Sequence, residues 1–233
     1  MNNNVKTIIK GAEVFYSDVK KEVNGRYKSW EHCYQLFYDV IKNNKKKDND
    51  YLALNLAFYL ASWGMYRGST FLLQKDYKIH CAAVDIIVKK EYKDLLEIKC
   101  KDLIDKTELL FSLVNELEKY YDDIRNQVAR NKRKVESKAS LSKTLLTKVL
   151  MGTLGCVPAY DRYLLTGLKT TGIAPQIFNE KSIKKICQFY IDNESDLEKV
   201  RKNLKIGSIK YPQMKLIDMG LWNKGEEEDR KRK

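Results

Sequence analysis

Glycine and proline gather in one short stretch of a chain that otherwise favours helix, and this cluster constrains the fold most. The chain has only 11 Gly and 3 Pro, yet Gly152, Gly155, Pro158 and Gly167 all fall within Leu146–Leu168. Both residue types are unfavourable inside a helix and common where the chain turns. Because the apolar spacing on both sides is helical, the sequence predicts a helix, a tight hairpin loop and a second helix.

Apolar residues recur at helical spacing along most of the remaining chain. We predict helices over residues 5–23, 30–42, 51–73, 80–89, 92–101, 106–131, 182–191, 195–204 and 211–222. The helix at 51–73 is apolar nearly all round, which predicts that it is the most buried element. The stretch Lys205–Tyr211 is the one short β candidate.

These patterns predict an all-α fold, a single globular multi-helix domain with a C-terminal helical sub-lobe. An N-terminal helical core is expected at 1–131, with the C-terminal helical hairpin region at 141–224 packed on it. The segment 132–140 loses apolar periodicity and is the best linker candidate. The charged tail at 225–233 is expected to be disordered.

The charge balance limits the classes of partner. Lys and Arg outnumber Asp and Glu by 44 to 31, which gives a net charge of +13. A field of this sign favours nucleic acid or an acidic protein as the partner. The alternative is that the excess lysines only form a solvated surface.

Cysteine and histidine usage argues against a metal or redox centre. The five cysteines have no C-x-x-C spacing, and the two histidines are far apart in the sequence. We therefore expect no metal site and no cofactor, and reduced cysteines in a cytoplasmic protein. The N-terminus lacks a signal-peptide core, and the longest apolar run, Tyr51–Met65, is too short to cross a bilayer. A soluble protein without membrane contact is expected.

The strongest basic cluster lies at the end of the predicted helix at 106–131. We predict phosphate contacts from these side chains, with Arg162 and Lys148 near the hairpin adding to them. The cluster consists of Arg125, Arg130, Lys132, Arg133 and Lys134.

The hairpin resembles, in outline, the helix-hairpin-helix of DNA repair glycosylases. Leu154, Gly155, Val157 and Pro158 can be laid over that motif, but two turn glycines are missing. The resemblance implies phosphate contacts from the turn, and catalysis by an Asp with a nearby Lys. Asp161 and Lys148 are the candidates here, although Asp161 lies inside the hairpin and the catalytic Asp of those enzymes follows it. The alternative is a structural turn in which Asp161 caps a helix.

An arginine in an apolar segment is the next candidate. Arg67 follows Trp63 and Tyr66 in the stretch ASWGMYRGST, and a buried charge there would need a partner. We predict that Arg67 pairs with Asp161, and that Trp63, Tyr66 and Tyr160 line the main pocket beside this pair. A structural ion pair is the alternative to a catalytic site.

Arg26 and His32 are an alternative catalytic pair. Their spacing in RYKSWEH resembles the Arg-x(4–6)-His pattern of HEPN-type ribonucleases, which are also all-α. That resemblance implies imidazole and guanidinium groups acting on the RNA 2′-hydroxyl and phosphate.

Four segments together resemble an uncharacterised bacterial family of all-helical proteins with no assigned activity. They are RYKSWEHCY, LASWGMYRGSTFLLQKDYKIH, GTLGCVPAYDRY and YPQMKLIDMGLW. The resemblance implies only that the four segments form one interdependent core. The sequence thus favours a basic helical protein that binds nucleic acid, DNA or RNA. The alternatives are a metal-independent nucleic-acid enzyme and a helical subunit of a bacterial defence-type complex.

Overall fold

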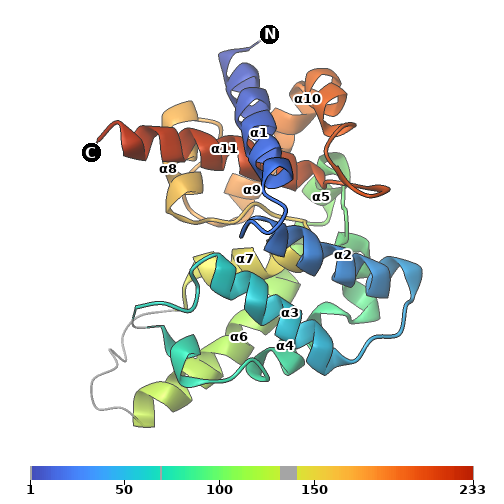
Figure 1. Ribbon diagram of the computed structural model, residues 1–233, viewed down its shortest axis with the longest axis vertical. Coiled ribbons are helices and arrows are strands. Elements are labelled where there is room, and N and C mark those ends of the chain that lie inside the picture. The colour runs from blue at the N-terminus through green and yellow to red at the C-terminus, as the bar shows by residue number, and fades with distance from the viewer. Residues whose placement is uncertain (1, 69, 132–140, 233) are drawn as a thin grey trace.

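The computed structural model describes residues 2–68, 70–131 and 141–232, and they are mostly helical (Figure 1). The predicted all-α fold is therefore confirmed. The first part of the chain forms α1 (Asn3–Lys21), α2 (Lys28–Asn43), α3 (Asn49–Ser62), the 3-10 helix η1 (Phe71–Gln74), α4 (Ile79–Ile87), the 3-10 helix η2 (Lys90–Leu95), α5 (Cys100–Asp105) and α6 (Thr107–Asn131). The second part forms α7 (Lys143–Thr153), α8 (Arg162–Thr171), α9 (Glu180–Asp192), α10 (Glu194–Arg201), the strands β1 (Lys205–Ile206) and β2 (Ile209–Lys210), and α11 (Gln213–Arg230).

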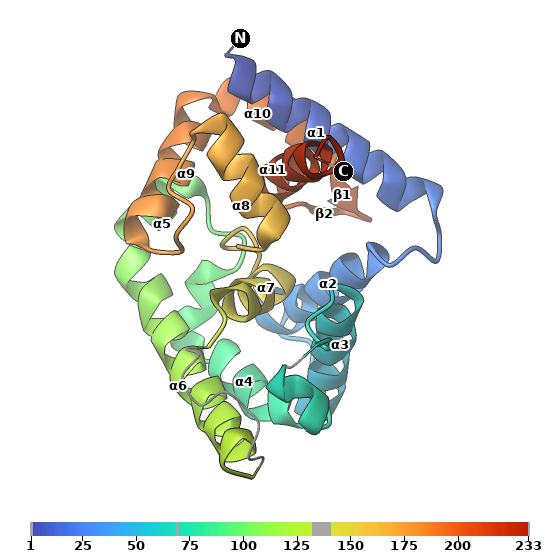
Figure 2. The same cartoon turned by 90° about the vertical axis from the view of Figure 1, so that its left-hand side faces the viewer.

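The helices form two tiers, which are separated most clearly in Figure 2. In the upper tier α11 packs against both α1 and α8, and in the lower tier α3 packs against α2, α4 and α7. The first helix of the chain thus packs on the last one. For this reason the two tiers do not follow the expected division into residues 1–131 and 141–224.

Glycines let α11 lie very close to its two neighbours. A Cβ atom on Gly11 of α1 would lie 2.8 Å from the carbonyl oxygen of Gly220 on α11. On the other side, Gly167 of α8 lies directly against the carbonyl of Leu221. A larger side chain at either crossing would push the helices apart. The close approach explains why α11 is buried continuously over residues 213–223.

The most buried helix is α7, not α3. Every residue from Leu145 to Thr153 is buried, whereas Leu54 and Phe58 on α3 are 46% and 62% exposed. The prediction that the third helix is the most buried element is therefore wrong. The apolar character of α3 misled the prediction, because one apolar face of this helix packs on the core and the other does not.

The predicted helix at 51–73 is also too long. The helix ends at Ser62, and Gly64 and Gly68 then take left-handed φ angles of 74° and 64°. These φ angles are easy for glycine and end a helix. The chain turns away at this point and continues into η1.

The end of the chain is more ordered than expected. The helix α11 continues to Arg230, so the prediction of a disordered tail at 225–233 is wrong for the part the structure describes. Ion pairs one turn apart support this last segment, with Lys224 2.8 Å from Glu228 and Arg230 3.1 Å from Glu226. The β candidate at 205–211 is confirmed as the antiparallel pair of β1 and β2.

Candidate functional site

The loop between α7 and α8 ends in a carboxylate that connects the two helices. Oδ1 of Asp161 accepts hydrogen bonds from the backbone N–H groups of Tyr163 and Leu164, both at 3.1 Å, which caps α8. Oδ2 lies 3.0 Å from Nζ of Lys148 on α7. The side chain of Asp161 is 15% exposed and that of Lys148 is 4% exposed. Both oxygens of Asp161 are therefore occupied, and the ion pair fixes the start of α8 on α7.

A second buried ion pair lies on α11, and its carboxylate is hydrogen-bonded to the same loop. Nζ of Lys215 is 2.9 Å from Oδ2 of Asp218, and the side chains are 3% and 7% exposed. Oδ1 of Asp218 accepts a hydrogen bond from the backbone N–H of Ala159 at 2.9 Å. Burial raises the pKa of Tyr59 well above its usual value, and the carboxylates of Asp218 and Asp161 add to the effect. The two carboxylates thus lie close enough together to act on one tyrosine.

Aromatic rings surround the two ammonium groups. Lys215 Nζ lies 4.8 Å from the ring centre of Trp30, 5.1 Å from that of Phe15 and 5.6 Å from that of Trp63. Lys148 Nζ lies 5.0 Å from the ring centre of Trp63 as well. Cation–π attraction of this kind partly offsets the cost of burying a charge. We call the residues Lys148, Asp161, Lys215, Asp218 and Trp63 the charge centre.

Four neighbouring aromatic rings, one of them Trp63 of the charge centre, connect Tyr27 with Tyr163. Ring centres are 5.4 Å apart for Tyr27 and Trp63, 6.0 Å for Tyr27 and Trp222, 6.1 Å for Trp63 and Trp222, and 5.0 Å for Trp222 and Tyr163. Trp222 is 5% exposed, and the other three rings are half-buried. We call these four residues the aromatic row.

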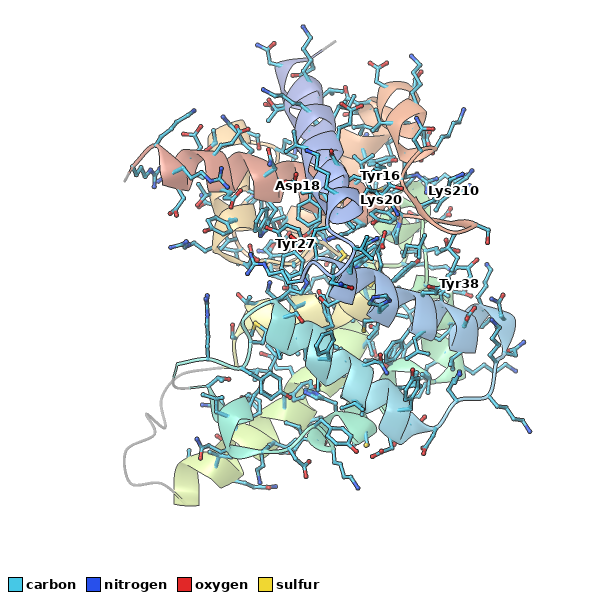
Figure 3. All side chains as sticks on the ribbon, in the orientation of Figure 1. Tyr16, Asp18, Lys20, Tyr27, Tyr38 and Lys210 are labelled. Carbon is cyan, nitrogen blue, oxygen red and sulfur yellow. The ribbon has the colours of Figure 1, made fainter. Side chains whose placement is uncertain are left out.

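An exposed arginine lies at each end of the aromatic row. The guanidinium carbon of Arg26 is 5.1 Å from the ring centre of Tyr27, and that of Arg162 is 4.7 Å from the ring centre of Tyr163. Figure 3 places Tyr27 beside the connection from α1 to α2. A hollow of about 430 Å³ opens there between the end of α1 and the Arg26–Tyr27 segment. The row is thus bordered by two cations and by an open space at the Arg26 end.

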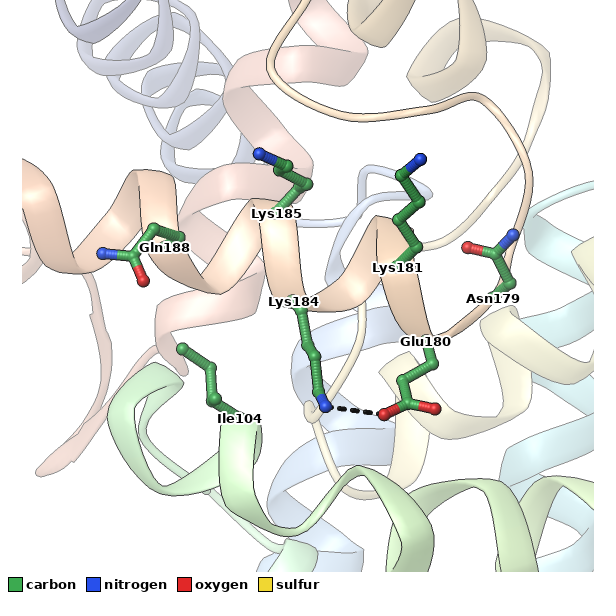
Figure 4. A pocket seen from close by; sticks show the side chains of 7 residues that line it. All are labelled: Ile104, Asn179, Glu180, Lys181, Lys184, Lys185 and Gln188. Atoms are coloured by element: carbon green, nitrogen blue, oxygen red, sulfur yellow. Dashed lines mark ion pairs between the residues drawn. The ribbon is translucent and has the colours of Figure 1, made fainter.

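A separate basic groove of about 740 Å³ runs along α9, beside α5 (Figure 4). Lys184 forms an ion pair with Glu180 at 2.6 Å, and the hydrogen bond from Lys184 lowers the pKa of that carboxyl. Lys181 and Lys185 project away from this pair in Figure 4. The groove offers positive charge without aromatic rings, since the other lining side chains are Ile104, Asn179 and Gln188.

The predicted ion pair between Arg67 and Asp161 is wrong. Asp161 pairs with Lys148, and the exposed side chain of Arg67 lies over Gly64 instead. The cause is the turn after α3, which directs Arg67 away from α7. The hairpin and α3 do touch, because Lys148 packs on Trp63.

The two tyrosines predicted to line the main pocket have other partners. Tyr66 places its hydroxyl oxygen 2.7 Å from Nε2 of the buried His80. Tyr160 is 3% exposed, and its hydroxyl lies 2.7 Å from Oγ of Ser182. Neither tyrosine lines the α9 groove or the hollow beside Arg26. The structure therefore does not bring Tyr66 and Tyr160 together around either of these cavities.

The remaining predicted residues do not come together in the described residues. Arg125 pairs with Asp122 at 2.9 Å and is 16% exposed. The side chains of Arg130, Lys132, Arg133 and Lys134 lie outside the described part of the chain. The structure therefore tests only one member of this predicted cluster.

The alternative catalytic pair is also separated. Arg26 lies over Tyr27, and His32 is exposed on α2, next to the buried Glu31. No hydrogen bond or ring contact between Arg26 and His32 occurs in the described residues.

Two of the five residues of the charge centre, Lys215 and Asp218, were not predicted from the sequence. Lys215 and Asp218 lie three residues apart in an apolar stretch, YPQMKLIDMGLW, and charged residues at that spacing share one helix face. Charges inside an apolar segment must find partners. That signal was available, but it could not show that Ala159 is the partner of Asp218.

The described residues contain no group of three or more His, Cys, Asp or Glu side chains that could hold a metal ion. No helix among them is long and apolar enough to cross a membrane. Comparison with family models, curated proteins and solved structures gave no match for this chain.

Proposed function

We propose that the protein binds single-stranded nucleic acid on the aromatic row, with Arg26 and Arg162 contacting the phosphates. The observation that supports this proposal is the row itself, three half-buried rings around the buried Trp222 with an exposed guanidinium at each end. Proteins that bind single strands combine aromatic platforms for the bases with cations along the backbone. The net charge of +13 favours the approach of any polyanion.

Trp63 adds a polar group that a base could use. Its Nε1 atom is buried and has no hydrogen-bond partner in the described part of the chain. A buried donor without an acceptor is costly. A base carbonyl or a ring nitrogen that reaches this atom would remove that cost, so binding would be favoured over stacking alone.

The arginines suit this role better than lysines would. A guanidinium is planar, stacks on an aromatic ring and still presents N–H donors to a phosphate. Arg162 is 67% exposed and its guanidinium carbon lies 4.7 Å from the ring centre of Tyr163. It also pairs with Asp229 at 3.2 Å, so a bound phosphate would compete with that carboxylate. Arg26 lies over Tyr27 and faces the open hollow.

Fluorescence polarisation with short labelled oligonucleotides tests the proposal. Single-stranded DNA, single-stranded RNA and a DNA duplex are compared at low salt, and we expect binding to a single strand to exceed binding to the duplex. The Arg26→Ala/Arg162→Ala variant should lose most of the affinity. A matched control, Lys90→Ala/Lys93→Ala, also removes two exposed positive charges, but from η2, and should keep it.

Two results would end the proposal. One is the absence of binding to any single strand at low salt. The other is a loss of affinity in Lys181→Ala/Lys185→Ala together with full binding by the arginine variant, because the α9 groove would then be the site.

The geometry favours a structural role for Lys148 and Asp161 over base excision. One carboxylate oxygen of Asp161 pairs with Lys148, and the other accepts the two hydrogen bonds that cap α8. A general base or a nucleophilic lysine must be free to reach its substrate. Incubation with an oligonucleotide that carries a damaged base, followed by alkaline cleavage, tests the enzymatic alternative directly.

A further inference from the structure

One face of α3 is apolar and exposed. Tyr51, Leu54 and Phe58 are 49%, 46% and 62% exposed, and Ala61, one turn further on, is exposed as well. The helix lies at the front of the lower tier in Figure 1. Scattered single apolar residues are normal on a surface, but a continuous set on one helix face marks an interaction site.

The spacing of these residues is that of a helix-pairing seam. Tyr51, Leu54, Phe58 and Ala61 follow one another at intervals of three, four and three residues. These are the a and d positions of a heptad, which form the seam between two packed helices. The opposite face of α3 is already buried in the core, so the seam is a second apolar face.

Two polar residues beside the seam already donate hydrogen bonds within α3. The side-chain amide of Asn55 donates to the Tyr51 carbonyl at 2.9 Å, and the hydroxyl of Ser62 donates to the Phe58 carbonyl at 2.9 Å. One donor of each side chain is thus satisfied within α3. A second helix could cover this face without leaving these donors unpaired.

We propose that α3 of one copy packs antiparallel on α3 of a second copy, which makes a twofold-symmetric dimer. In this arrangement each a position faces a d position. Leu54 then faces Phe58 of the second copy, and the bulky Tyr51 faces the small Ala61. Both pairs have their midpoint at residue 56, so a single twofold axis satisfies them together, as a dimer of this symmetry requires.

The charges at the ends of α3 favour the antiparallel direction. The N-terminal end carries two carboxylates, and the exposed Arg67 follows the C-terminal end. Asp48 caps the helix, while Asp50 accepts a hydrogen bond from Tyr77 at 2.9 Å and lies 4.0 Å from Lys78. The last turn of α3 contains no basic residue to complement the partial negative charge of its free carbonyls. Antiparallel packing brings Arg67 near the carboxylates of the second copy.

Lys47 supports the same direction. Its Nζ lies 5.6 Å from the ring centre of Tyr51, at the N-terminal end of the seam. Antiparallel packing places it near the carbonyl end of the second α3, where a cation is favourable.

Light scattering during size-exclusion chromatography measures the expected dimer. The full chain should elute at twice its mass of 27.3 kDa at high micromolar concentration. The Phe58→Glu variant should elute at the mass of one chain with an unchanged circular dichroism spectrum, because Phe58 is 62% exposed. Its melting temperature should not depend on protein concentration, since the dimer is lost. The control Ile177→Glu, at another exposed apolar residue (68%), should remain dimeric.

The proposal is wrong if the wild-type chain is monomeric at this concentration. It is also wrong if Phe58→Glu remains a dimer. A chain that stays monomeric but sediments with phosphatidylserine vesicles would instead assign the face to a membrane surface. None of these outcomes depends on the proposed binding of nucleic acid.

Cross-linking tests the direction of packing. The experiment uses a Cys81→Ser background, because Cys81 is the one partly exposed cysteine and the other four are buried. A short bis-maleimide should join Tyr51→Cys to Ala61→Cys in a mixture of the two variants. Tyr51→Cys alone should react poorly, since its two copies lie at opposite ends of the seam. Efficient cross-linking of Tyr51→Cys to itself would show parallel packing and contradict the proposal.

Discussion

The Nζ atom of Lys148 lies 3.0 Å from Oδ2 of Asp161, and this contact joins the last helix of the lower tier to the first helix that follows the hairpin. Lys148 also packs on Trp63 of the turn after α3. One lysine thus connects α3, α7 and α8. The pair holds the base of the proposed binding surface, because Trp63 belongs to both the charge centre and the aromatic row.

Replacing Asp161 by alanine should destabilise the fold by about 3–5 kcal/mol, as expected when one member of a buried ion pair is left without its partner. Urea unfolding followed by circular dichroism measures the change. Asn179→Ala is the matched control, because Asn179 caps α9 through the Ser182 N–H without an ion pair. Loss of that cap alone should cost about 1 kcal/mol. Equal losses in the two variants would contradict the role of the ion pair.

A double-mutant cycle separates the charge from the cap. Asp161→Asn keeps an oxygen for the cap of α8 but removes the charge. Lys148→Met removes the partner charge and keeps an apolar chain of similar length. If the ion pair carries the energy, the double variant should be more stable than the sum of the two single losses predicts. Strict additivity would show that the two side chains act independently.

The close crossing of α8 and α11 should make the fold sensitive to substitution of Gly167. Gly167→Ala would place a methyl group against the Leu221 carbonyl, so we expect a loss of about 1–3 kcal/mol from overpacking. Thr170→Ala is the control, since Thr170 lies on the same helix and is exposed. Alanine there should change the free energy of unfolding little. A stable Gly167→Ala variant would mean that the two helices can separate without loss.

The sequence predicted the helices because apolar periodicity is a local property. The cap at Asp161 was the alternative to a catalytic role, and the capping bonds to Tyr163 and Leu164 are present. Prediction from the sequence failed where the outcome depends on which segments meet. The pairing of Asp161 with Lys148 rather than Arg67 follows from a turn set by two left-handed glycines, Gly64 and Gly68.

The burial of individual helices could be predicted from their apolar composition only in part. The helix α3 is apolar on both faces, and its sequence alone could not show that one of them remains exposed. The packing of α1 on α11 joins the two ends of the chain, and no local pattern encodes such a contact. The charges of Lys215 and Asp218 were visible in the sequence, but their aromatic surroundings depend on four separate helices.

The buried His80 should make the fold less stable in acid. Its Nε2 and Nδ1 atoms lie 2.7 Å from the hydroxyl oxygens of Tyr66 and Tyr121, and burial lowers the pKa of His80 from 6.5 to about 4. Between these two values the unfolded chain binds a proton that the folded chain does not. Stability from this residue is therefore complete above pH 6.5 and is lost as the pH falls toward 4, by about 3 kcal/mol.

Urea unfolding at about pH 7 and about pH 4 measures this loss. Carboxylates titrate over part of the same range, so the comparison is made with His80→Gln, which retains a donor and an acceptor but does not titrate. The variant should lose less stability between the two pH values than the wild-type chain. If both lose the same amount, His80 is not the group responsible.

The salt dependence of oligonucleotide binding should separate phosphate contacts from stacking. Each phosphate contact on a single strand contributes about 0.7 to the slope of log K against log salt. Arg26→Ala should therefore reduce the magnitude of the slope by about 0.7, and the double variant with Arg162→Ala by about 1.4. Tyr27→Leu removes an uncharged ring from the aromatic row, so it should weaken binding by about 1–3 kcal/mol at every salt concentration and leave the slope unchanged. A slope that falls for Tyr27→Leu, or that stays constant for the arginine variants, would mean that the strand does not lie along the aromatic row.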